Sequence, residues 1–344
     1  MTKYNIFSYL FVLAALCIAL SSSADFFGLE EWEHEVTKQK LFCLEDVHRA
    51  GSQDQQDDLL WVAKQLDACV IAEDALSYEG NNAIIKKYCA SFESIFQPSP
   101  LVYLIKKCKK AHMRCENVEY RFAQIILEST LHVYGIEKLK AIVGDLEKFK
   151  QYVQQEEQAS IKEIKSYQYQ DPYFQELHTH LLGRALKRAG NYPIDELLKA
   201  SDPAKFMEIV EKNMFDAAGF LDLRILRQLY VYRKSKHLII AAGAAHINGL
   251  LRFLPMLGYH KVNRVGKSVE ALSDFDIKKM ELYEKLGCAS LDIGKYFNEH
   301  PILHLPKSPV QKGKEACLDK LKGSLIMTGL LGLTGALVYY MASS

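Results

Sequence analysis

The sequence contains no C-x-x-C pair, no internal repeat and no excess of charge of either sign. The lack of C-x-x-C argues against a zinc ribbon or a thioredoxin-type redox site. The 43 lysines and arginines are balanced by 42 aspartates and glutamates, so the net charge is +1 and no basic footprint for nucleic acid is present. What remains is ordinary globular composition over 344 residues, enough for one large domain or two small ones.

Both ends of the chain carry hydrophobic segments. Residues 1–24 hold a lysine, an apolar run and then small residues, which is typical of a cleaved signal peptide, with an uncleaved signal anchor as the alternative. Residues 324–342 carry no charge and are long enough for one transmembrane helix, preceded by a linker from 311. We therefore expect an exported protein attached to the membrane by its C-terminal helix. Lysines before that helix oppose the positive-inside tendency and would suit a tail anchor on a cytosolic domain.

The cysteines do not define a disulfide framework. Of the eight, one lies in the presumed signal segment, so an odd number remains and their pairing cannot be read from the sequence. Cys43, Cys69 and Cys115 fall inside short apolar runs, and buried free cysteines behave as small hydrophobic residues. We therefore expect these three to be core residues.

Short apolar runs separated by helical patterns predict an α/β fold with a largely parallel sheet and crossover helices. Fully buried parallel strands are continuous apolar runs, and short turns between strands and helices favour such a sheet. Residues 25–120 and 236–310 form the two halves of this predicted domain. Helices are expected at 54–66 and 247–258, the second kinked by Pro255. The predicted strands are 40–44, 68–72, 112–117, 237–242 and 259–265.

The section between the two halves, 121–235, has a different character. It is long, charged and poor in glycine and proline, with apolar residues at helical spacing. Asp171–Pro172 and Asp202–Pro203 are good helix starts, because proline suits the first turn of a helix. We expect a large helical insertion that forms a cap over the sheet.

Ionisable residues follow four of the predicted strands. In an open α/β sheet, ligands bind outside the carboxyl ends of the strands, so these residues are expected to meet in one cleft. The alternative is that each is a structural cap, which is the commoner role for a lone histidine after an apolar run. The candidate catalytic residues are Glu45, His48, Glu73, Arg121 and His246.

This set of residues suits acid–base chemistry on water. A histidine beside a carboxylate can act as a general base, and an arginine can bind an anionic group or an oxyanion. Alternatively, His48 and His246 with carboxylates could hold a divalent metal whose bound water becomes the nucleophile. The E-x-x-H at 45–48 lacks the second histidine of H-E-x-x-H, so its spacing is not diagnostic of a metal.

Several of these motifs resemble one broad superfamily. LEDVH (44–48) and VIAED (70–74) resemble the erythromycin esterase pattern, and AAGAAHINGLLRFLPMLGY (241–259) is similar to the Gly-x-x-His strand and helix of TraB and Tiki proteins. ChaN-like haem-binding proteins belong to the same group. The resemblance implies site roles for Glu45, His48, Glu73 and His246. Leu44 replaces the glycine of the esterase pattern, and only one Gly-x-x-His is present.

Two further segments fit the resemblance less specifically. NVEYR (117–121), with Glu119 and Arg121, is similar to a third-strand motif of such domains. FLDLRILRQLY (220–230) is like the helix that supplies an arginine, which implies Arg224 or Arg227.

The leading interpretation is a membrane-attached, exported hydrolase-like domain acting on an ester or peptide, with a small molecule or peptide as substrate. The first alternative is a non-enzymatic protein that binds haem, a metal or a small ligand in the same pocket, with His48 and Tyr78 as haem-iron ligands. The second is a host- or partner-interaction protein with a vestigial pocket.

Overall fold

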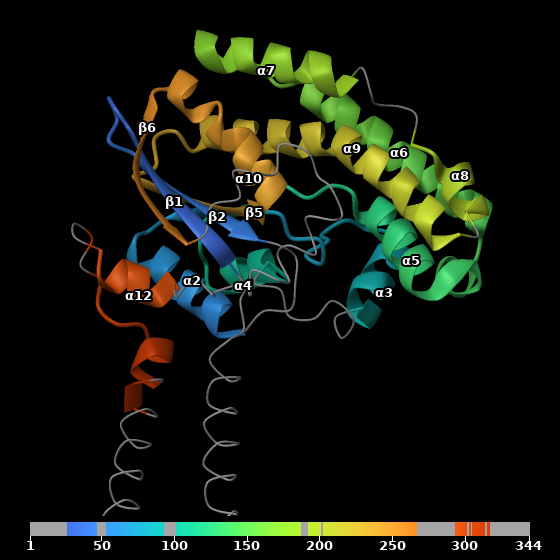
Figure 1. Ribbon diagram of the computed structural model, residues 1–344, viewed down its shortest axis with the longest axis horizontal. Helices are drawn as coiled ribbons and strands as arrows, with labels where there is room; N and C mark the ends of the chain where they lie inside the picture. The colour runs from blue at the N-terminus through green and yellow to red at the C-terminus, as the bar shows by residue number, and fades with distance from the viewer. Residues whose placement is uncertain are drawn as a thin grey trace, which may run out of the picture.

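The computed structural model describes residues 26–46, 53–92, 101–186, 192–200, 202–266, 293–300, 303, 305–313 and 315–316. Within these ranges the chain forms an α/β fold around a mixed six-stranded sheet (Figure 1), with the strand order β4-β3-β5-β2-β1-β6. The strands are β1 (Phe26–His34), β2 (Lys40–Asp46), β3 (Cys69–Ala72), β4 (Cys115–Asn117), β5 (His237–Gly243) and β6 (Tyr259–Gly266).

Four neighbouring strands make the parallel part of the sheet. β5 pairs in parallel with β2 on one side and with β3 on the other, and β3 pairs in parallel with β4. All seven residues of β2 and of β5 are buried, as their apolar sequences predict. The prediction that the strands ending near Leu44, Ala72, Asn117 and Ala242 are neighbours is therefore confirmed.

β1 was not predicted, and it makes the sheet mixed. It runs antiparallel between β2 and β6, so residues 259–265 do form a strand but pair with β1 instead of extending the parallel part. β1 is rich in glutamate, and both Glu30 and Glu31 are buried in it. Each is held by cations from elsewhere in the chain: Glu31 by Lys40, and Glu30 by Lys261 and Arg264. Buried carboxylates persist when they are paired in this way.

Helices cover both faces of the sheet (Figure 1). Side chains alternate along the strands, so Leu41 and Cys43 pack toward α7 (Pro172–Leu186), α9 (Pro203–Val231) and α10 (Ala244–Leu251). Phe42 and Leu44 point the other way, toward α2 (Gln53–Gln65), α4 (Leu104–Lys110) and α12 (Ile293–Asn298). Cys43, Cys69 and Cys115 are buried free thiols, which confirms their expected place in the core.

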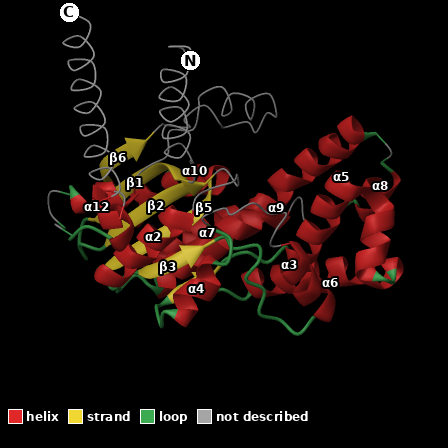
Figure 2. Cartoon of the chain, turned by 90° about the horizontal axis from the view of Figure 1, so that it is seen from below, coloured by secondary structure: helices red, strands yellow, loops and turns green. Residues whose placement is uncertain are grey.

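The described part of the section between β4 and β5 consists of helices and their connecting loops and holds no strand. It comprises α5 (Phe122–Val143), α6 (Leu146–Lys165), α7, α8 (Ile194–Lys199) and α9. Both predicted Asp-Pro starts are present: Asp171 accepts a hydrogen bond from the Tyr173 amide, and Asp202 accepts one from the Ala204 amide. With α3 (Ala83–Phe92), helices α5, α6 and α8 lie beside the sheet, on the side away from β6 (Figure 2).

The predicted helix 247–258 is shorter and interrupted. α10 begins earlier, at Ala244, and ends at Leu251, and a separate 3-10 turn, η1 (Leu254–Leu257), follows. Pro255 lies in that turn, as expected for a residue that cannot continue an α-helix. Gly258 ends the turn in a left-handed conformation with φ of 80°.

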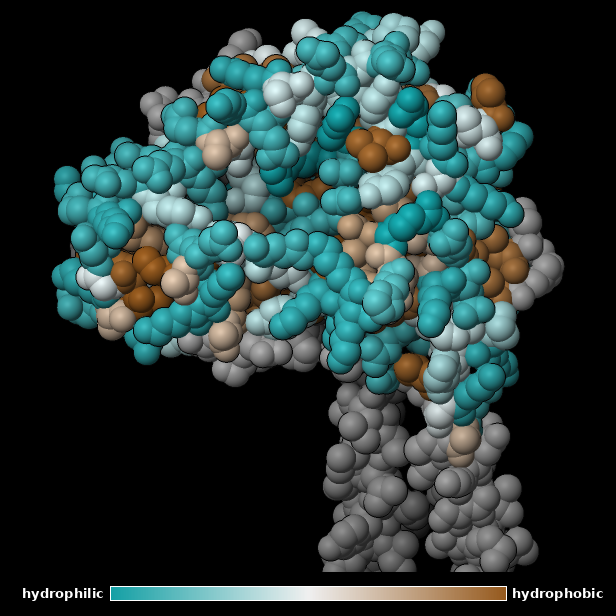
Figure 3. Space-filling view, turned by 180° about the vertical axis from the view of Figure 1, so that it is seen from behind, coloured by the Kyte–Doolittle hydropathy of each residue, from teal (hydrophilic) through white to brown (hydrophobic). Residues whose placement is uncertain are grey.

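The expectation of a transmembrane helix is corrected. Across the described ranges, no helix combines the length and the apolar character needed to cross a bilayer. The two segments on which the expectation rested, 1–24 and 324–342, lie outside those ranges. The outer face drawn in Figure 3 is mostly hydrophilic, with small and separate hydrophobic patches.

Candidate active site

Glu73 lies at the carboxyl end of β3 and is the centre of the site. Its amide donates to the carbonyl oxygen of Ala241 on β5, which continues the parallel pairing by one residue. Its side chain is buried, and Oε2 accepts a hydrogen bond of 2.8 Å from the amide of Gly243, the last residue of β5. The Glu73 carboxylate, at the end of β3, thus accepts from the backbone amide of Gly243, the residue that precedes α10.

His246 is the third residue of α10 and points at Glu73. Its Nε2 lies 3.9 Å from Glu73 Oε1, and its Nδ1 lies 2.9 Å from Asp222 Oδ1, which comes from α9. Because a carboxylate accepts the bond, Nδ1 carries the proton, and the lone pair of the neutral imidazole is on Nε2. Burial opposes the charged ring, but the carboxylates of Glu73 and Asp222 outweigh it, so the pKa of His246 is raised.

Arg121 joins Glu73 to a second carboxylate. Its Nη2 lies 2.9 Å from Glu73 Oε1 and 2.7 Å from Glu119 Oε2, while its Nε donates to Glu119 Oε1. Burial raises the pKa of Glu119, but the adjacent guanidinium more than compensates and the net shift is downward. The fork of Arg121 is thus engaged by two carboxylates of its own chain, and we assign it a positioning role instead of the predicted anion-binding one.

The loops after β3 and β4 are fixed to each other by Asn117 and Asp74. Asn117 Oδ1 accepts from the amides of Asp74 and Glu119, and its Nδ2 donates to the Asp74 carbonyl oxygen. The Asp74 carboxylate accepts from the amides of Leu76, Ser77, Tyr103 and Ile105 and from the Ser77 hydroxyl. These bonds hold Glu73 and Glu119 at the distance that Arg121 bridges.

Glu45 lies on the same face of the sheet, two strands from Glu73. In the register of the sheet it is paired with Ala242 of β5, and parallel partners point to the same side. With strands about 4.8 Å apart, this separates the Glu45 and Glu73 backbones by roughly 10 Å. The Glu45 carboxylate lies 3.2 Å from Arg264 on β6, and burial raises its pKa to about 7. The ion-pair partner of Glu45 is therefore Arg264 rather than His246.

Four further candidates of the sequence analysis remain. His48 is outside the described residues, so its catalytic and metal-binding roles stay predictions. Arg224 pairs with Glu163 and stacks on Tyr120, and Arg227 stacks on Tyr167 and neighbouring rings. The Tyr78 hydroxyl lies 3.4 Å from the hydroxyl of Tyr152 in α6, and its role as a haem ligand stays a prediction.

The metal-binding expectation stays a prediction, because His48, one of its two histidines, lies outside the described residues. Among the described residues, no group of three or more histidine, cysteine, aspartate or glutamate side chains is arranged to hold a metal ion. Near Glu73 the positive partner is instead the guanidinium of Arg121, which approaches Oε1. We therefore derive no step through a metal.

Sequence reasoning missed Asp222, although it singled out the segment that contains it. Asp222 stands between Leu221 and Leu223, both fully buried. An acidic residue between buried apolar ones is the signal that could have identified it. Gly249 on α10 faces it: a Cβ atom there would lie 3.4 Å from Asp222 Oδ2, in van der Waals contact.

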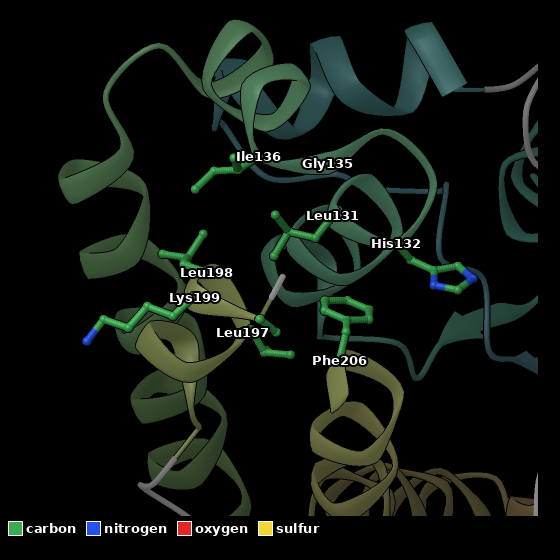
Figure 4. Close-up of a pocket in the computed structure, with 9 residues that line it drawn as sticks. Leu131, His132, Gly135, Ile136, Leu197, Leu198, Lys199 and Phe206 are labelled. Atoms are coloured by element: carbon green, nitrogen blue, oxygen red, sulfur yellow. The ribbon is translucent and has the colours of Figure 1, made fainter. Parts of the chain in front are cut away.

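The described chain also has a cavity of about 360 Å³ in the helical section, away from the strand ends. It lies between α5, α8 and α9, where Leu131, Leu197 and Phe206 point toward one another and Lys199 extends away (Figure 4). Its lining does not include the charged residues around Glu73. We therefore treat the cavity as separate from the candidate active site.

Comparisons of the chain with models of protein families, with curated proteins and with solved structures give no match. They therefore lend no support to the esterase-like or TraB-like resemblance, or to hydrolase activity. The functional argument rests on the geometry around Glu73.

Proposed function

We propose that Asp222, His246 and Glu73 form an acid–base centre that activates water for the hydrolysis of an uncharged or cationic ester or peptide. The observation that carries the proposal is the position of the His246 ring, with Nδ1 on Asp222 and Nε2 facing Glu73. An aspartate that orients a histidine and stabilises its charged form is half of the arrangement found in hydrolytic triads. Because the partners of the ring are carboxylates, the nucleophile proposed here is water.

In this mechanism neutral His246 is the general base. Water lying between Nε2 and Glu73 Oε1 would give its proton to Nε2 as its oxygen attacks the substrate carbonyl. Asp222 stabilises the resulting imidazolium, and the imidazolium then protonates the leaving group. Arg121 keeps the Glu73 carboxylate in place. General acid–base catalysis of this kind contributes about 100- to 10,000-fold in rate.

The charge of the site favours substrates without a negative group. Glu73, Glu119 and Asp222 contribute three carboxylates, and Arg121 bridges the first two of them. An anionic substrate would be repelled by these carboxylates. To bind Arg121, it would also have to displace one of the two carboxylates that Arg121 bridges. An uncharged ester or a peptide with a cationic side chain meets neither cost.

The test is hydrolysis by the full chain of a panel of uncharged aryl esters, cationic peptides and matched anionic esters. We expect turnover of uncharged or cationic members and a loss of at least about 100-fold in kcat/KM for His246→Gln. His178→Gln is the matched control, because His178 is equally buried but contacts the Ile164 carbonyl in the helical section. No turnover by wild type, or equal turnover by His246→Gln, would favour the ligand-binding or interaction alternatives.

A further inference from the structure

Two cysteine side chains interact with each other at the β4 edge of the sheet, apart from the acid–base centre. Cys108 lies in α4 and is fully buried, and Cys115 is the first residue of β4 and is 8 % exposed. Both belong to the apolar core that α4 makes with this face of the sheet.

The backbone between the two residues brings them together. The chain reverses at His112, which has a φ of 56°, and the amide of Met113 donates to the carbonyl oxygen of Cys108 at 3.0 Å. Two residues later, the Cys115 thiol donates to the carbonyl oxygen of Ile105, one turn before Cys108 in α4. The first residue of β4 therefore lies against the turn of α4 that carries Cys108.

The two thiols differ in exposure, which sets their order of reaction. Cys115 is 8 % exposed at the start of β4, whereas Cys108 is fully buried in α4. The ammonium of Lys109 lies near Cys115 and favours its charged form. The thiolate is the reactive form of cysteine, so Cys115 is the expected site of attack on an oxidant and Cys108 the resolving thiol.

We propose that Cys108 and Cys115 are a peroxide-oxidisable pair that closes an intramolecular disulfide between α4 and β4. The Cys115 thiolate attacks one oxygen of hydrogen peroxide, giving a sulfenic acid and hydroxide. The Cys108 sulfur then attacks the Cys115 sulfur, a sulfur–sulfur bond forms, and water leaves with the Cys108 proton. The two thiols are together oxidised by two electrons, and one peroxide is reduced to water.

The position of α4 gives the bond a structural consequence. The amides of Tyr103 and Ile105, at the start of α4, donate to the carboxylate of Asp74, the residue after Glu73. A bond from Cys108 to β4 therefore fixes the other end of the helix that holds Asp74. The oxidised chain is expected to unfold at a higher temperature than the reduced chain, because the cross-link restricts the unfolded ensemble.

The test is a peptide map of the full, folded chain after treatment with hydrogen peroxide and alkylation of remaining thiols. Trypsin cuts after Lys107, Lys109, Arg114 and Arg121, so the disulfide joins peptide 108–109 to peptide 115–121 with the loss of two hydrogen atoms. We expect this linked pair to form at least about tenfold faster than any oxidation of Cys89. Cys89 is a matched control, since it is similarly buried but its thiol is hydrogen-bonded to the Tyr78 backbone and its pKa is raised to about 11.

The linked peptide should disappear in Cys108→Ser and in Cys115→Ser and remain in Cys89→Ser. The proposal is overturned if the folded wild-type chain yields both cysteines as separately alkylated thiols at a peroxide dose that fully oxidises the denatured chain. It is also overturned if either cysteine is found linked to a different one. Should a serine variant fail to fold, the wild-type map decides the matter alone.

Discussion

The Nδ1 atom of His246 lies 2.9 Å from Oδ1 of Asp222, which joins the first turn of α10 to the middle of α9. The same imidazole presents Nε2 to Glu73 at the end of β3. His246 is therefore positioned by Asp222, from α9 in the long section between β4 and β5, and by Glu73 at the edge of the parallel part of the sheet. His246 lies in the first turn of α10, three residues after the end of β5, and from this position its ring reaches carboxylates from both parts.

The Asp222→Asn variant is expected to lose about 1,000- to 10,000-fold in kcat/KM, because an amide cannot hold the ring in the same tautomer or stabilise its charge. General-base activity requires neutral His246, so kcat/KM should rise as pH increases through the raised pKa of this residue. Without the Asp222 anion, that inflection should move to lower pH. The measurement is a pH–rate profile of both proteins on one substrate of the panel, and an unchanged inflection in Asp222→Asn would count against the pair.

Arg121→Met is expected to destabilise the fold by about 3–5 kcal/mol, because it leaves two buried carboxylates without their shared cation. Arg114→Met is the matched control: Arg114 pairs with Asp67 at the surface, where the side chains are 45 % and 94 % exposed, and its loss should cost no more than about 1 kcal/mol. Urea unfolding of both variants measures the difference. Equal costs would mean that Arg121 does not hold Glu73 and Glu119 together.

Glu45→Gln is expected to change how stability depends on pH. Burial raises the pKa of Glu45 from 4.5 to about 7, so the folded chain holds this proton at pH values where the unfolded chain has released it. Its contribution to stability is therefore fully present below pH 4.5 and is lost as pH rises through 7. Relative to wild type, Glu45→Gln should gain about 3 kcal/mol in free energy of unfolding between pH 4 and pH 8.

The check is urea unfolding of Glu45→Gln and wild type at a series of pH values. The difference between the two proteins should grow in favour of the variant across that window. A difference in free energy of unfolding that stays constant with pH would show that the pKa of Glu45 is the same in the folded and unfolded chains. That result would contradict a raised pKa caused by burial.

Asp74→Ala is expected to destabilise the fold by about 2–4 kcal/mol, since it leaves several buried amides without an acceptor. Asp202→Ala is the comparison, because Asp202 caps an exposed helix end and accepts one bond from the Ala204 amide; its loss should cost about 1 kcal/mol. Thermal unfolding of both variants measures which substitution destabilises the fold more. A cost for Asp74→Ala no greater than that of the cap would contradict its role in holding α4 and the loop after Glu73.

The sequence carried enough information to predict the parallel part of the sheet and its charged edge. Buried strands such as β2 and β5 are unbroken apolar runs, and residues after their ends share one edge by topology alone. That argument brought Glu73, Arg121 and His246 together. It could not show that the Arg121 guanidinium is paired with Glu119. That contact between two residues of one loop depends on the folded shape of the loop.

The sequence could not reveal β1 or Asp222 in the same way. Glu30 and Glu31 resemble solvent-exposed residues, and their cationic partners, Lys261 and Lys40, are identified only by sheet register. In the sequence, Asp222 lies far from every strand end. In its segment, the resemblance implied a role for Arg224 or Arg227 and not for Asp222. Its role follows from how α9 packs on α10, and that packing is set by tertiary contacts and not by a local motif.

An NMR titration of the histidine rings shows whether Asp222, His246 and Glu73 act as one acid–base unit. His178 and His237 serve as internal references, because burial lowers the pKa of each. In the folded wild-type chain the His246 ring should titrate above its ordinary value of 6.5, and its pKa should fall in both Asp222→Asn and Glu73→Gln. A His246 ring that titrates at or below 6.5 and is unchanged in both variants would contradict the claim.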